Sequence, residues 1–109
     1  MWDQVRARRD RFEAIEAEMA TPEVARDPAR LQSLGKERAQ LEPLVQLLAD
    51  YERAADDLSQ AREVVADGAD ADLKELAEAE LEELEARIAG LEERAKRALL
   101  PRDQNDERN

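Results

Sequence analysis

The stretch LAEAELEELEARIAGLEERAKRALL, residues 76–100, carries the clearest structural pattern in the chain. Its small and apolar residues recur at alternating spacings of four and three: Ala77, Leu81, Leu84, Ile88, Leu91, Ala95 and Ala98. This heptad spacing gathers them along one side of a helix, where they form a seam that a second helix must cover. The pattern predicts a helix over residues 72–99, and Pro101 is expected to end it.

Two earlier segments have helical spacing as well. Residues 2–20 place Val5, Phe12, Ile15 and Met19 on one face, and Arg8 falls where the seven-residue pattern expects an apolar side chain. Residues 28–66 form a longer helix with a leucine-rich stripe. Thr21 before Pro22 and Asp27 before Pro28 are both typical of helix starts, in which a capping side chain precedes a proline at the first helical position.

Pro43 lies inside the long segment and Gly68 lies just after it. Pro43 removes a backbone hydrogen bond and crowds the preceding turn, so we expect a kink or short break near residues 40–43. Gly68 suits a left-handed helix end, and Asp70 or Asp72 can cap the helix that follows.

The predicted fold is all-α: an elongated, antiparallel three-helix bundle with coiled-coil-like packing and a long second helix kinked near Pro43. At 1.5 Å per residue, helices of about 39 and 27 residues give a rod about 58 Å long. We expect a monomer, with a dimer through the heptad seam as the alternative.

Composition excludes several classes of site. The chain has neither histidine nor cysteine, so the commonest general base, zinc ligands and disulfides are absent. Glu78, Glu82 and Glu85 share a helical face but lack the Glu-x-x-His unit of di-metal bundles. We therefore expect no enzyme activity, no cofactor and no metal site. No long apolar run or signal peptide is present, which favours the cytoplasm.

Charge is unevenly distributed. The net charge is −11, and residues 63–93 hold twelve acids against two bases. This balance argues against DNA binding by bulk electrostatics. The local exception is RARRDR, residues 6–11. Arg6, Arg8, Arg9 and Arg11 are candidates for contact with RNA phosphate or an acidic partner; the alternative is pairing with Asp3, Asp10 and Glu13 on the same helix.

The chain resembles a known family along its whole length. LLPRDQNDERN, residues 99–109, is similar to the segment that joins the first two domains of bacterial class I peptide chain release factors, especially the members that read UAA and UAG. Gln104 stands where that family is expected to have proline. RLQSLGKERAQLEPLV, residues 30–45, and ADLKELAEAELEELEARI, residues 71–88, resemble the family's second and third helices.

The resemblance implies a division of the chain and a function. Residues 1–100 correspond to the family's N-terminal helical domain, and residues 101–109 to the start of a linker toward a codon-reading domain. The codon-reading tripeptide and the Gly-Gly-Gln loop of the family are not in this sequence. The implied role is a non-catalytic module that binds the ribosome at the large-subunit stalk base, with the recycling GTPase as a further partner. The alternative is a self-contained acidic coiled-coil adaptor or scaffold.

Overall fold

The computed structural model describes residues 1–68 and 70–101, and these residues form four α-helices and no strand. The helices are α1 (Trp2–Met19), α2 (Pro22–Ala25), α3 (Pro28–Asp67) and α4 (Ala71–Leu99). The all-α class and the three long helices are confirmed. The one-turn helix α2 lies in the connection between α1 and α3, and it begins at Pro22 with Thr21 as its cap.

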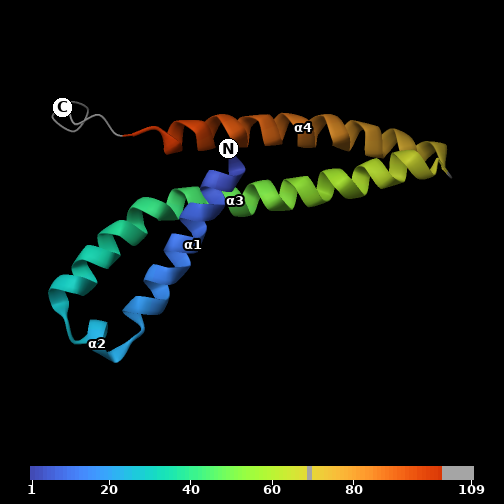
Figure 1. Cartoon of the computed structure of the whole chain (residues 1–109). Helices are drawn as coiled ribbons and strands as arrows, with labels where there is room; N and C mark the ends of the chain where they lie inside the picture. Colours follow the sequence, from blue (N-terminus) through green and yellow to red (C-terminus); the bar gives the residue numbers. More distant parts are fainter. Residues whose placement is uncertain (69, 102–109) are drawn as a thin grey trace.

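Helix α3 is the common partner of the other two long helices. α1 runs antiparallel along its first part and α4 runs antiparallel along its second part, so the chain forms two helical hairpins that share α3 (Figure 1). The N-terminus lies near the middle of the molecule, where α1, α3 and α4 approach one another (Figure 1). The three-helix arrangement is therefore antiparallel but staggered.

Pro43 lies inside α3, which continues without a break on both sides of it. The helix changes direction in its middle, as Figure 1 shows. The predicted kink is thus confirmed, whereas the alternative of a short break is wrong. Because of this bend the molecule measures 62 × 38 × 18 Å and is a flat, angled body rather than the expected rod.

The core consists of three clusters of buried side chains. The α1–α3 cluster contains Phe12, Ile15, Leu34 and Leu41. The junction cluster contains Val5, Leu44, Leu48 and Ala95, with Trp2, Leu47, Tyr51 and Leu99 packed against it. The α3–α4 cluster contains Ala54, Ala61, Leu84 and Leu91. The buried residues of the junction cluster come from all three long helices, so this cluster couples the two hairpins.

The heptad seam of α4 is confirmed over most of its length. Ala77, Leu84, Leu91 and Ala95 are buried, and Leu81 and Ile88 are half-buried. The prediction fails at Ala98, which is exposed while Leu99 packs at the junction. A straight helix has 3.6 residues per turn, so its contact face drifts away from a strict seven-residue repeat. At this end of α4, helix α1 also packs at the junction cluster, which Leu99 faces.

Helix ends follow the punctuation in the sequence. The side chain of Asp27 accepts a hydrogen bond from the Arg30 amide at 3.1 Å, and Thr21 accepts one from the Val24 amide. Asp70, rather than Asp72, caps α4 by accepting hydrogen bonds from the amides of residues 72 and 73. Gly68 ends α3 with φ +62°, in the left-handed region.

Replacing Gly68 with alanine is expected to lower the free energy of unfolding by about 1 kcal/mol, because the added Cβ disfavours a positive φ. Its space is open, so strain in the backbone is the main cost. Gly90→Ala is the matched control. Gly90 lies inside α4 with equal room, so its replacement should stabilise the chain by about 0.5–1 kcal/mol. Urea unfolding of both variants measures the contrast, and a shift in the same direction would contradict it.

The domain division remains a prediction. Helix α4 ends at Leu99 and Leu100 is extended. Residues 102–109, most of the predicted linker, lie outside the described residues.

Candidate functional site

The four arginines singled out in the sequence lie on α1, and three of them are paired. Arg6 contacts Asp3 at 3.0 Å on the same helix. Arg9 reaches across to α3 and donates to Glu52 at 2.9 Å. The sequence alternative of pairing along α1 is thus realised for Arg6, while Arg9 pairs mainly between helices.

The structure separates Arg8 from Arg9. Arg9, not Arg8, turns toward α3 between Val5 and Phe12 and is half-buried. Arg8 is exposed, and among the described residues no ion pair involves it. Arg9, one residue after the position that the seven-residue pattern indicates, thus lies beside the apolar stripe of α1.

Arg11 makes the most specific ion pair of the group. Its Nε donates to Glu37 Oε2 at 2.6 Å and its Nη2 to Oε1 at 2.8 Å, a two-pronged contact between α1 and α3. These hydrogen bonds hold the pKa of the Glu37 carboxyl below its ordinary value and raise the pKa of Arg11. Arg11 therefore fixes the position of α1 on α3 and is less available to a partner than Arg8.

The depressed pKa of Glu37 predicts a pH effect of definite sign. Its contribution to stability is present above the pKa of the unfolded chain and is lost as pH falls through the lower pKa of the folded chain. The native chain should therefore lose more stability than Glu37→Gln between about pH 7 and about pH 3. The difference is small because both groups face solvent. It should vanish in an Arg11→Ala background, and its persistence there would contradict the pairing.

Two further arginines reinforce the α1–α3 hairpin. Arg38 donates to Glu16 at 3.0 Å and lies 4.7 Å from the centre of the Phe12 ring. Arg30 donates to Glu18 at 2.9 Å. Much of the charge on this hairpin is therefore balanced between its own helices.

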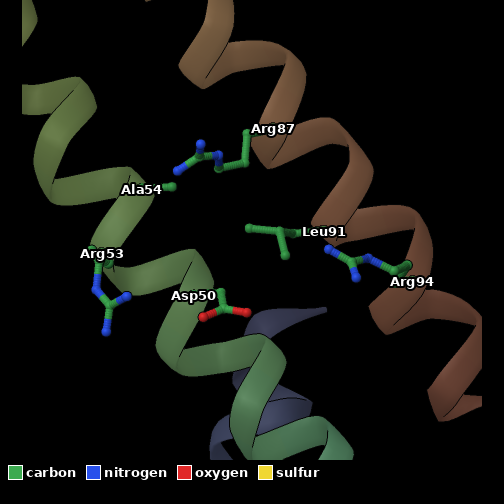
Figure 2. Close-up of a pocket in the computed structure, with 6 residues that line it drawn as sticks. All are labelled: Asp50, Arg53, Ala54, Arg87, Leu91 and Arg94. Carbon is green, nitrogen blue, oxygen red and sulfur yellow. The ribbon is translucent and has the colours of Figure 1, made fainter.

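A shallow groove between α3 and α4 holds basic groups that sequence reasoning missed. It has a volume of about 220 Å³ and is lined by Asp50, Arg53, Ala54, Arg87, Leu91 and Arg94. In Figure 2, the side chains of Arg87 and Arg94 extend from α4 toward the groove, whereas the Arg53 guanidinium points away from it. The heptad pattern is enough to predict that Arg87 and Arg94 flank Leu91 on α4. It does not predict that Asp50 and Arg53, from a distant segment of the chain, lie beside them.

The chemistry that these surfaces allow is binding. The groove offers guanidinium groups and one carboxylate, without a hydroxyl, thiol or imidazole to act as a nucleophile or base. Within the described ranges, no three carboxylates gather closely enough to hold a metal ion. In the same ranges, no helix has the length and apolar character needed to cross a membrane.

Comparison with known proteins identifies the family. The family model described as the PCRF domain matches residues 8–109. The chain belongs to the peptide chain release factor family. The resemblance found in the sequence is therefore confirmed.

Individual relatives agree with this assignment. Peptide chain release factor 1 of Listeria welshimeri is 33% identical over 109 residues, all of this chain and 30% of the relative. Peptide chain release factor 1 of Listeria innocua gives the same values. The Bacillus licheniformis protein of that name is 32% identical, again over all of this chain and 31% of the relative. The chain thus spans about 30% of the length of these release factors, in their N-terminal part. No solved structure matches it significantly.

Proposed function

We propose that the chain serves as the N-terminal domain of a translation termination factor that directs release of the nascent peptide at UAA and UAG codons. Residues 1–100 form this domain and residues 101–109 begin the linker toward a codon-reading domain. The observation that carries the proposal is the match along all 109 residues to the N-terminal part of release factor 1 proteins. The domain acts in the cytoplasm by positioning the factor, without catalysis of its own.

The ribosome is the partner in this proposal, contacted at the stalk base of the large subunit, and the recycling GTPase is a further partner. The two hairpins support this role because they give an extended body whose long helix is held from both sides. Charged side chains on α1, namely Arg6, Arg8, Arg9 and Arg11, provide the basic contact. Among them Arg8 carries the most available guanidinium.

A chimera tests the proposal. The matching N-terminal part of Listeria welshimeri release factor 1 is replaced by this chain, and peptide release is measured on ribosomes stopped at UAA, UAG and UGA. We expect release at UAA and UAG, with the choice of codon made by the Listeria part, together with co-sedimentation of the free chain with large subunits. A folded chimera that releases no peptide, with a free chain that does not bind ribosomes, would overturn it.

Arg8→Ala is expected to weaken binding of the chain to ribosomes by a few-fold. If Arg8 contacts one RNA phosphate, the slope of log affinity against log salt should also fall by about 1. Arg62→Ala is the matched control, since Arg62 is an exposed residue of α3 without an ion pair in the described part of the chain. An equal effect of both variants, or no change in the slope for Arg8→Ala, would remove Arg8 from the contact.

The alternative function is that of an acidic coiled-coil adaptor. The seam of α4 already lies against α3, so it is not free to pair with another chain without opening the hairpin. Sedimentation at micromolar concentration separates the two: the termination domain is monomeric, whereas the adaptor is a dimer.

A further inference from the structure

The end of the α3–α4 hairpin presents apolar side chains to solvent. Leu73 and Leu76 are 55% and 68% exposed, and Val64, on the last turn of α3, is 41% exposed. All residues from Ala71 to Leu76 are exposed, and Ala77 is the first residue of α4 to be buried. We call Val64, Leu73 and Leu76 the hairpin tip. The fold itself does not use these leucines.

Leu73 and Leu76 belong to one surface. They are three residues apart on a helix, a spacing that places side chains next to each other. On a solvent-facing turn, two neighbouring leucines add little to the stability of the fold. A partner that covers them removes a large apolar area from water, which favours binding. The remaining two exposed large apolar residues in the described ranges, Met1 and Leu100, lie at helix ends far from the tip.

The surroundings of the tip are acidic and unpaired. Ten carboxylates lie in residues 63–85, with Lys74 as the single base. In the described part of the chain none of these carboxylates takes part in an ion pair, in contrast to those of the α1–α3 hairpin. Asp67 even lies at the C-terminal end of α3, where the helix dipole disfavours negative charge. Asp70 and Asp72 serve the fold, since Asp70 caps α4 and Asp72 lies in its first turn, but the other eight carboxylates take no such part.

We propose that the hairpin tip docks on a basic protein surface that has an apolar recess for Leu73 and Leu76. The inference rests on the proposed function and adds a second contact to it, distant from the arginines of α1. Charge selects this occupant. Phosphates of RNA are repelled by unpaired carboxylates, and a second copy of the chain would bring the same negative tip. A basic protein surface attracts the carboxylates, and its apolar recess buries the leucines.

The test uses purified large ribosomal subunits and the whole chain. Leu73→Ser combined with Leu76→Ser should weaken binding by about tenfold for each leucine that is buried in the contact. Leu100→Ser is the matched control, because Leu100 is 67% exposed at the other end of α4. Unchanged affinity of the double variant, with Arg8→Ala still effective, would overturn the tip contact and leave the proposed function standing. If the unmodified chain does not bind large subunits, both the tip contact and the proposed function are overturned.

Cross-linking identifies the occupant. Ala79 is exposed and three residues beyond Leu76 on the same face, so a photoreactive benzoylphenylalanine at position 79 reports on what covers the tip. We expect a cross-link to a ribosomal protein with a basic surface, and its disappearance in the double serine variant. A cross-link to ribosomal RNA or to a second copy of the chain would overturn the proposal.

Discussion

Replacing Leu48 with alanine is expected to lower the free energy of unfolding by about 3 kcal/mol, within the range of about 2–5 kcal/mol for buried leucines. Leu48 is 0% exposed and belongs to the junction cluster, where α1, α3 and α4 meet. Truncation leaves a cavity between three helices. Because each helix is already held by its own hairpin, the surroundings cannot easily collapse into that space, which raises the cost.

Chemical unfolding followed by circular dichroism measures this change. Leu76→Ala is the control, since the same atoms are removed from a side chain that is 68% exposed and the change should stay within about 0.5 kcal/mol. A loss below about 1 kcal/mol for Leu48→Ala would mean that the two hairpins are not coupled through the junction.

Trp2→Ala is expected to cost about 3 kcal/mol, the lower end of the range for large aromatic residues because Trp2 is only half-buried. Its ring stacks on Tyr51 with centroids 4.0 Å apart and planes inclined by 13°. It also packs against both the junction cluster and the α3–α4 cluster. Trp2 thus holds the first turn of α1 on the middle of α3.

Trp2→Phe should be nearly neutral, which separates stacking from the polar atom of the indole. In the described residues Trp2 Nε1 is buried and has no hydrogen-bond partner. Such a donor costs about 1–3 kcal/mol, so its removal offsets much of the apolar area that phenylalanine lacks. If phenylalanine is as damaging as alanine in urea unfolding, the indole nitrogen has a partner in solution and the offset does not exist.

Periodicity was enough to predict the helices and most of the seam on α4. It did not identify the buried alanines of α3, Ala54 and Ala61, which pack in the α3–α4 cluster. A methyl group adds little to an apolar pattern, but it lets two helices approach closely. Which alanine faces α4 therefore depends on the register between helices, and one helix alone does not specify it.

The arginines illustrate a second limit of sequence reasoning. RARRDR is recognisable as a basic cluster, yet the partners of Arg9 and Arg11 are Glu52 and Glu37, many residues away. Pairing at three or four residues is visible in a sequence, whereas pairing between helices requires the bend and stagger of α3. The groove beside Arg87 and the exposed leucines of the hairpin tip follow from the same geometry.

The stagger of the hairpins also sets an order of assembly during synthesis. The ion pairs of α1 and the Trp2–Tyr51 stack reach no further along α3 than Glu52. About half of the chain can therefore adopt its native contacts before α4 has left the translating ribosome. The apolar face of the remainder of α3 stays exposed to solvent until α4 packs on it. Ala95 and Leu99, near the end of α4, are the last side chains to join the junction cluster. Nascent chains halted before α4 should thus already contain the first hairpin.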